Sequence, residues 1–407
     1  MPLPRFPRVL ILSLVLVVVA GCGVDAGSAP TLTPDPALPA TAAALFPTPV
    51  PSEAPTPTPL AESDAAEAIA RVLAEMQNAI FTRDAEAYLA RIDLDADPTF
   101  RLEHTRWVED WDTGTGSVLQ FGLTIRNLTV NDAGTAATAD LTMTWSTLTS
   151  MQVSRGADFP VRFTRGADGR WRYAGEYFAL EQETEHFIVR AMAGLEPVVA
   201  EMTAYLPAVY DHVTATLDHV PQGKQVIKLY NNPWSLVATT RLSLTQEIAG
   251  WNEPGEALKL VGEAARDEAT LAHEFAHFLT FDLAGTTRGS YPWWVAEGIS
   301  EYAASHFWTG ADRIARIAAV QERRRADGLV AWDDLAVFEE TPESLWRYAY
   351  LQGYAFMRFI TDAYGDEARN AWIHAMARQP LEEATQAVFE SDFRALNAAF
   401  LDWLNAQ

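Results

Sequence analysis

The period of the hydrophobic residues changes twice along the chain, and this limits the possible folds more than any other feature. Apolar residues recur at helical spacing from Ile69 to Phe81, which predicts an amphipathic helix. Between Val118 and Tyr177 they alternate, and the turn sequences NDAG and GADG divide this stretch into antiparallel hairpins. From Arg266 to the C-terminus the spacing is again helical. The chain is therefore predicted to be an α+β protein with a mainly helical C-terminal half.

The N-terminus reads as a targeting segment. Arg5 and Arg8 precede an apolar run from Val9 to Ala20, which is shorter than the roughly 20 residues of a membrane span but suits a signal peptide. Cys22, the only cysteine, follows in the sequence VAGC, which resembles a bacterial lipobox. The resemblance implies a signal peptide over 1–21 and a lipidated Cys22 that anchors an extracytoplasmic protein to the bacterial cell membrane. A plain secretory signal and an uncleaved anchor are the alternatives.

Residues 22–61 are dense in Pro, Thr and Ala and have no hydrophobic period. Such a segment buries too little apolar surface to fold, so it is predicted to be an extended tether. The net charge of −24 over 407 residues argues against nucleic acid as a partner, because phosphates would be repelled. The short basic run at 323–325 is interpreted as a solvated helix end.

The sequence HEFAH at 273–277 carries the clearest chemical signal. His273 and His277 lie one turn apart on a predicted helix that begins near Arg266 and ends at Gly285. Two imidazoles at this spacing can bind one Zn²⁺ ion, while Glu274 projects about 100° away, where it can reach a water on the metal. The alternative is a packed helix that carries two histidines by chance, so the hypothesis depends on a third ligand.

The segment PWWVAEGISEYAA at 292–304 offers that ligand. Glu297 and Glu301 lie one turn apart on a predicted helix with few other polar positions, and like charges at this spacing repel unless a cation lies beside them. We expect Glu297 to bind the metal and Glu301 to accept the second N–H of a ligand histidine. A solvated acidic face is the alternative. Pro292 is expected in the first helical turn, with Ser290 near the cap.

The two motifs, with nineteen residues between His277 and Glu297, resemble the gluzincin group of metallopeptidases, the peptidase MA-like lineage. The resemblance implies one zinc ion held by His273, His277 and Glu297. It also implies Glu274 as general base and Glu301 as an acidic residue that supports a ligand. The sequence EGISEY further resembles MA-like members found in bacterial lipoproteins and secreted proteins.

The segment YLQGYAFMRFI at 350–360 resembles the stretch that carries the transition-state tyrosine of M1-like gluzincins. This implies that Tyr350 stabilises the oxyanion. Tyr348 and Tyr354 are predicted on the same helix, and core packing is the alternative for each tyrosine. The sequence IAGWNEPGEALKLV does not match the G-x-M-E-N motif of M1 exopeptidases, which favours an endopeptidase.

Residues 62–182 form the first predicted domain. A long helix followed by hairpins that end in DGRWRY resembles the NTF2/SnoaL-like cone, and its His104 is assigned to core packing in preference to a ligand pocket. Residues 183–407 are expected to form the gluzincin-type domain, in which EHFIVRAMAG, KQVIKLYNN and GEALKLV predict a small β-sheet.

Together these features predict a zinc-dependent metallopeptidase that hydrolyses peptide bonds by metal-activated water with Glu274 as the base. The strand in GEALKLV is a candidate to align an extended substrate by strand addition. One alternative is a surface-tethered binding lipoprotein with a vestigial peptidase fold. Another is a zinc hydrolase that acts on something other than peptides.

Overall fold

The computed structural model describes residues 62–97, 99–112, 118–147, 154–244, 246–285 and 291–407, together with the two-residue strand β1 (Val17–Val18). Apart from β1, the predicted signal peptide over 1–21 lies outside these residues. The predicted lipidation site Cys22, the tether over 22–61 and Ser290 also lie outside them. In the described part of the chain, no helix combines the length and apolar character needed to cross a membrane.

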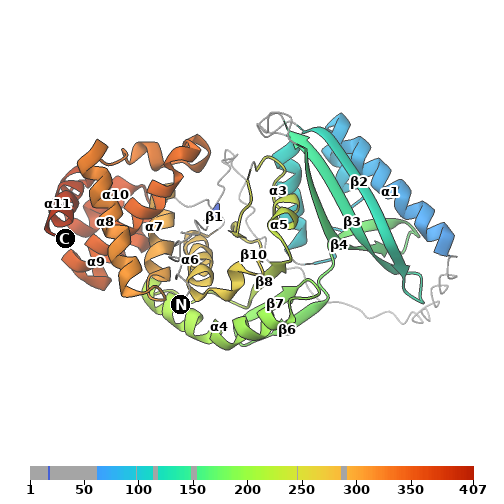
Figure 1. The fold of residues 1–407 in the computed structure, drawn as a ribbon, viewed down its shortest axis with the longest axis horizontal. Helices are drawn as coiled ribbons and strands as arrows, with labels where there is room; N and C mark the ends of the chain where they lie inside the picture. The colour runs from blue at the N-terminus through green and yellow to red at the C-terminus, as the bar shows by residue number, and fades with distance from the viewer. Residues whose placement is uncertain are drawn as a thin grey trace, which may run out of the picture.

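The first region contains the predicted helix and both hairpins. Its helices are α1 (Glu62–Thr82), α2 (Ala85–Leu89) and α3 (Phe100–Asp112). An antiparallel sheet in the order β2-β3-β4-β5 comprises β2 (Val118–Val130), β3 (Ala136–Thr147), β4 (Arg155–Arg165) and β5 (Trp171–Glu176). The turns NDAG and GADG end in glycines with positive φ, 64° at Gly134 and 75° at Gly169, a conformation that glycine adopts without strain. Helix α1 lies along this sheet (Figure 1).

A second sheet has the strand order β1-β9-β10-β8-β7-β6. Strands β7 and β8 are parallel because helix α4 crosses over between them. Strand β10 is parallel to β8 on its other side, and β9 is antiparallel to β10. The elements are β6 (Leu180–Glu183), β7 (Phe187–Ala191), α4 (Glu196–Leu217), β8 (Gln225–Tyr230), α5 (Pro233–Ala238), β9 (Gly250–Trp251) and β10 (Leu258–Val261).

Strand β10 corresponds to GEALKLV, and it pairs with β8 on one side and β9 on the other. The expectation that this strand adds a substrate strand is therefore wrong, because both of its edges are already hydrogen-bonded. The neighbouring strand β9 lies nearer the edge of the sheet, and its outer side pairs with the backbone of β1.

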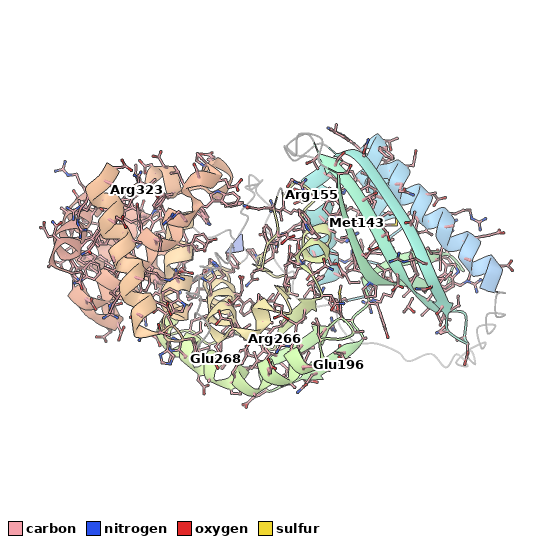
Figure 2. The ribbon with its side chains drawn as sticks, viewed as in Figure 1. Met143, Arg155, Glu196, Arg266, Glu268 and Arg323 are labelled. Atoms are coloured by element: carbon pink, nitrogen blue, oxygen red, sulfur yellow. The ribbon has the colours of Figure 1, made fainter. Side chains whose placement is uncertain are left out.

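The predicted helical C-terminal half is confirmed. It comprises α6 (Glu268–Ala284), α7 (Trp293–Ala304), α8 (Gly310–Asp327), α9 (Trp346–Met376, interrupted at Gly365), α10 (Leu381–Phe389) and α11 (Phe393–Ala406), with 3₁₀ turns at Ala264–Arg266, Asp333–Leu335, Phe338–Glu340 and Glu343–Leu345. Helices α7 to α11 occupy one end of the molecule and the four-stranded sheet the other, with the six-stranded sheet and α6 between them (Figure 1). Figure 2 labels Glu196 at the start of α4 and Glu268 at the start of α6.

Buried charges join the first region to the six-stranded sheet. Glu103 of α3 accepts a hydrogen bond from Nζ of Lys228 on β8 at 2.7 Å and from the backbone N–H of Ala257 at 3.0 Å. Nζ of Lys259 on β10 lies 3.7 Å from the same carboxylate. Burial raises the pKa of Glu103, but Lys228 and Lys259 more than offset it and bring the pKa down to about 2. Helix α3 is thereby attached to two strands of the other sheet.

Aromatic residues complete this contact. The indole N–H groups of Trp107 and Trp145 donate to the carbonyls of Ala238 and Leu242, at 2.9 and 3.2 Å. His104 stacks between the first region's aromatic rings, and burial lowers its pKa to about 3. Core packing is therefore the role that the structure shows for His104.

Exchange of Glu103 for Gln should destabilise the protein by about 3–5 kcal/mol at pH 7, because Lys228 stays buried without its carboxylate partner. The folded pKa of Glu103 lies below its ordinary value of 4.5. Its stabilisation is therefore complete above that pH and is lost as the pH falls toward 2. Urea unfolding of wild type and Glu103→Gln across this range measures both effects. Glu67→Gln, on the exposed side of α1, should change stability by less than about 0.5 kcal/mol. If Glu103→Gln were as stable as the wild type at pH 7, Glu103 would not be the stabilising partner of Lys228.

Candidate metal centre

Helix α6 carries the HEFAH sequence through the interior of the protein. Asp267 caps its N-terminus, accepting hydrogen bonds from the backbone N–H groups of Ala269 and Thr270, as N-cap residues do. Leu271, Phe275 and Leu279 are fully buried as the helical spacing predicts, and the fourth predicted position, 278, is half-buried. Because the histidine side of the helix is buried too, α6 has almost no solvated side.

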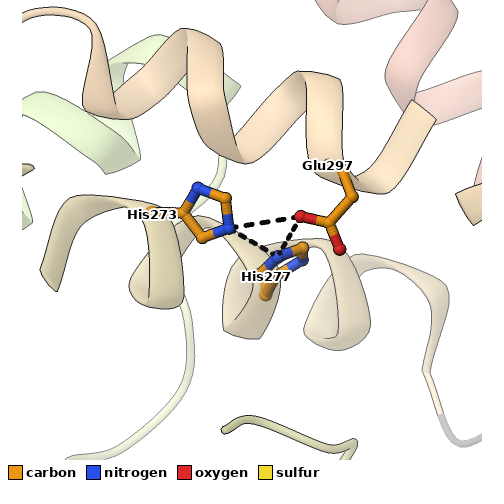
Figure 3. Close-up of side chains that lie close together, drawn as sticks. All are labelled: His273, His277 and Glu297. Atoms are coloured by element: carbon orange, nitrogen blue, oxygen red, sulfur yellow. Dashed lines mark hydrogen bonds and ion pairs between the residues drawn. The ribbon is translucent and has the colours of Figure 1, made fainter. Parts of the chain in front are cut away.

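His273, His277 and Glu297 converge between α6 and α7 (Figure 3). The two Nε2 atoms are 3.0 Å apart, and Oε2 of Glu297 lies 3.3 Å from Nε2 of His273 and 3.4 Å from Nε2 of His277. Ligand atoms that surround a tetrahedral Zn²⁺ at 2.0–2.1 Å are roughly 3.3 Å from one another. The spacing of these three atoms therefore fits a zinc ion.

Glu297 is held in place by its own helix. The indole N–H of Trp293, one turn earlier on α7, donates to Oε1 of Glu297 at 2.8 Å, which leaves Oε2 facing the histidines. Burial raises the pKa of Glu297, but the two imidazoles more than offset it and lower the pKa to about 2.

The expected position of Pro292 in the first helical turn is wrong. Its ψ of 145° is extended, so α7 begins one residue later, without a side-chain cap.

Glu301 lies behind His273. Its Oε1 is 3.0 Å from Nδ1 of His273, and its second oxygen pairs with Arg316 of α8. When Nε2 of His273 binds a metal ion and gives up its proton, the proton that remains on Nδ1 is directed at Glu301. Burial lowers the pKa of His273, but its bonds to Glu297 and Glu301 raise it to about 10. The Arg316 guanidinium also lies over the ring of Trp308, 3.8 Å from its centroid.

The carboxylate of Glu274 is completely buried beside the centre. Within the described ranges neither of its oxygens has a hydrogen-bond partner. Its backbone carbonyl accepts a bond from Nδ2 of Asn252 at 3.0 Å, and a Cβ on Gly250 of β9 would lie 2.5 Å from Oε1. Burial, assisted by the charge of Glu297, raises the pKa of Glu274 to about 8. Glu274 can therefore take up a proton near neutral pH.

Of the three tyrosines considered from the sequence, Tyr350 is the one at this site. Its ring stacks on that of His273, with centroids 6.0 Å apart and planes 21° apart. Tyr354 packs against Trp308, and Tyr348 lies beside Arg323. The structure thus brings together His273, Glu274, His277, Glu297, Glu301 and Tyr350, whereas Cys22 lies outside the described residues.

Two glycines allow α7 and α9 to touch through their backbones. A Cβ on Gly298 would lie 2.6 Å from the backbone of Gly353, and one on Gly353 would lie 2.3 Å from the carbonyl oxygen of Trp294. Through this close approach Glu297 of α7 and Tyr350 of α9 both lie next to His273. It also gives a physical reason for the glycines in EGISEY and YLQGY.

Sequence reasoning missed Trp293, Asn252 and Arg316. The first could have been found, because Trp293 and Glu297 are one turn apart on the same helix. Arg316 is the cation that the Glu297/Glu301 spacing required, but it comes from a different helix. No local pattern connects it, or Asn252, to the motif.

No protein-family profile and no curated protein matches the chain. Solved structures with a similar arrangement include an M1 zinc metallopeptidase from Deinococcus radiodurans, at 14% identity and a TM-score of 0.35 over 70% of this chain. A mutant of that enzyme gives 13% identity and 0.37. The chain spans 61% of the length of that protein. At this identity and TM-score the similarity establishes neither a shared fold nor a shared activity.

Purified protein should contain one zinc ion per chain, and His277→Ala should reduce this to a small fraction because one of three ligands is removed. Elemental analysis after dialysis against zinc-free buffer measures the content. His306→Ala, at an exposed histidine outside the centre, should keep full occupancy. Unchanged zinc in His277→Ala would exclude this centre as the binding site.

Gly353→Ala should force α7 and α9 apart and lower stability by about 1–3 kcal/mol, because a methyl group has no room against the Trp294 carbonyl. It should also weaken zinc binding, since Glu297 moves with α7. Thermal unfolding and zinc titration measure the two effects. Gly310→Ala is the matched control, because a Cβ there meets nothing within 4 Å. Wild-type behaviour of Gly353→Ala would argue against the close helix contact.

Proposed function

We propose that this protein is a zinc-dependent metallopeptidase, with endopeptidase activity. One observation carries the proposal: three buried ligand atoms of His273, His277 and Glu297 converge beside the buried carboxylate of Glu274, which has no hydrogen-bond partner among the residues that the structure describes. A structural role for that carboxylate would require a hydrogen-bond partner, because an unsatisfied buried carboxylate costs more than 1–3 kcal/mol. A water molecule bound at the metal centre can donate the hydrogen bond that this carboxylate lacks.

The residues suit the chemistry of the ion. Zinc, when bound, lowers the pKa of water toward 7 and polarises a carbonyl group. Glu274 accepts the proton of the attacking water at its carboxylate and returns it to the leaving amine. Tyr350, beside His273, donates a hydrogen bond from its hydroxyl to the developing oxyanion. Glu301 keeps the Nδ1 proton of His273 in place, and Arg316 holds Glu301.

A peptide suits this centre because an extended backbone can bind next to it. Strand β9 contacts Glu274 through Gly250, and its outer edge pairs with the extended backbone of Val17–Val18. Substrate strands commonly add to such an edge. We assign to β9 the alignment role that the sequence suggested for β10, because cleavage of a signal peptide over 1–21 would remove β1 and leave the outer edge of β9 open.

We further propose that the enzyme is a bacterial lipoprotein that faces outward, anchored to the cell membrane through a lipidated Cys22. The support comes from the sequence: an apolar signal run, the VAGC motif and a Pro-rich tether of about 40 residues. Its substrate is a peptide or protein, and nucleic acid is not expected to bind a chain with a net charge of −24.

Glu274→Gln should retain its zinc and lose proteolysis by roughly 10²–10⁴-fold, because the amide cannot accept the water proton. Cleavage of casein with zinc content measured in the same samples separates the two effects. Glu268→Gln, on the exposed start of the same helix, should cleave at the wild-type rate.

Casein cleavage by Glu274→Gln at the wild-type rate would disprove the role of Glu274. Wild-type protein that binds zinc but cleaves no member of a peptide library would favour a hydrolase of other substrates. Protein that holds no metal would favour the surface-tethered binding lipoprotein.

A further inference from the structure

A cavity of about 420 Å³ lies where the four-stranded sheet meets the six-stranded sheet, away from the metal centre. Ligand pockets typically have volumes of 300–1,000 Å³. The rings of Phe100, Phe163 and Phe178 contribute to its wall, and Tyr177, 40% exposed, stands at its rim. The peptidase proposal uses none of these residues.

Glu176 is the unexplained group in this cavity. Its side chain is only 9% exposed, yet it lines the cavity. Across the described ranges, no hydrogen bond or ion pair to its carboxylate is formed, in contrast to Glu103 nearby, which has both. A buried carboxylate without a partner is unfavourable, so one of this kind that opens onto a cavity indicates a missing cationic or donor partner.

A β-bulge between β4 and β5 lies directly before Glu176. Val161 of β4 pairs with Glu176 of β5 and Phe163 pairs with Tyr173, so two residues of β5 oppose the single residue Arg162. One of the two, Gly175, has a φ of 88°, a conformation that glycine adopts readily. Bulges redirect side chains near sites. Here the bulge brings Arg162 and Glu176 to the wall of one cavity.

Arg162 provides the opposite charge. Its guanidinium donates only to backbone carbonyls, those of Ala174 at 2.9 Å and Ala96 at 3.0 Å. None of the carboxylates in the described ranges forms an ion pair with it, so its positive charge is not neutralised. The remaining cations on the wall are already paired: Arg190 with Asp97 and Glu181, and Lys228 with Glu103.

The cavity therefore presents one free positive charge, one free negative charge and aromatic surface. We propose that it binds a small zwitterion, a free amino acid or short peptide. In this arrangement the ligand's ammonium group pairs with Glu176, its carboxylate pairs with Arg162, and an apolar side chain packs on the phenylalanine rings. The inference does not rest on the proposed peptidase activity, because binding here involves no residue of the metal centre.

Isothermal titration calorimetry with the dipeptide alanylphenylalanine tests this, using the full chain with Glu274→Gln so that any hydrolysis is suppressed. The dipeptide should bind, and its N-acetylated and C-amidated forms should each bind at least about tenfold more weakly, because each lacks one charge-assisted bond. Adding Glu176→Gln should weaken dipeptide binding by a similar factor. Glu183→Gln, an exposed carboxylate on β6 that does not line the cavity, should leave it within about twofold.

Dipeptide binding that is unaffected by Glu176→Gln would place the ligand elsewhere, including at the metal centre, and would overturn the proposal. So would equal binding of the blocked and free dipeptides, a comparison that needs no cavity variant and holds even where Glu176→Gln fails to fold. If no binding is measurable up to about 10 mM dipeptide, the charged groups of the cavity are simply hydrated and the proposal is wrong.

Discussion

The burial of ionisable side chains between α6 and α7 is the constraint on which the helical half depends. Moving two imidazoles and three carboxylates out of water is unfavourable unless each group has a partner. The neighbouring elements supply most of these partners: Trp293 holds Glu297, while Glu301 and Arg316 support His273. In the described part of the chain, Oε2 of Glu297 and both carboxylate oxygens of Glu274 stay without a hydrogen-bond partner at this centre. The packing of these helices and the geometry of the site thus both follow from the need to give each buried ionisable group a partner.

Buried ion pairs also connect the first region to the metal centre. Arg106 of α3 pairs with Glu256 at 2.9 Å, and Arg241 pairs with Glu253 at 3.0 Å. Both carboxylates lie in the connection between β9 and β10, and β9 contacts Glu274. A network of buried ion pairs therefore connects α3 to β9, the strand that contacts Glu274. The first region helps to position that strand, in addition to forming the zwitterion cavity.

Sequence reasoning succeeded where the determinants are local. Alternation and turn glycines predicted both hairpins, and helical spacing with i,i+4 pairs predicted that His273, His277 and Glu297 lie on two helices. It failed where partners come from distant segments. The interior position of β10 depends on β8 and β9, and Arg316 reaches Glu301 from a third helix. Pairing across a sheet and between helices has no fixed sequence spacing, so these features needed the structure. The resemblance of the first region to an NTF2-like cone stays a prediction.

The structure predicts one zinc ion, held by two imidazoles and one carboxylate in a buried centre. X-ray absorption at the zinc edge of the intact protein tests it most directly. We expect four nitrogen or oxygen ligands at about 2.0–2.1 Å, with the outer-shell scattering of two histidines and no sulfur. A sulfur ligand, a six-coordinate oxygen shell or fewer than two imidazoles would contradict it.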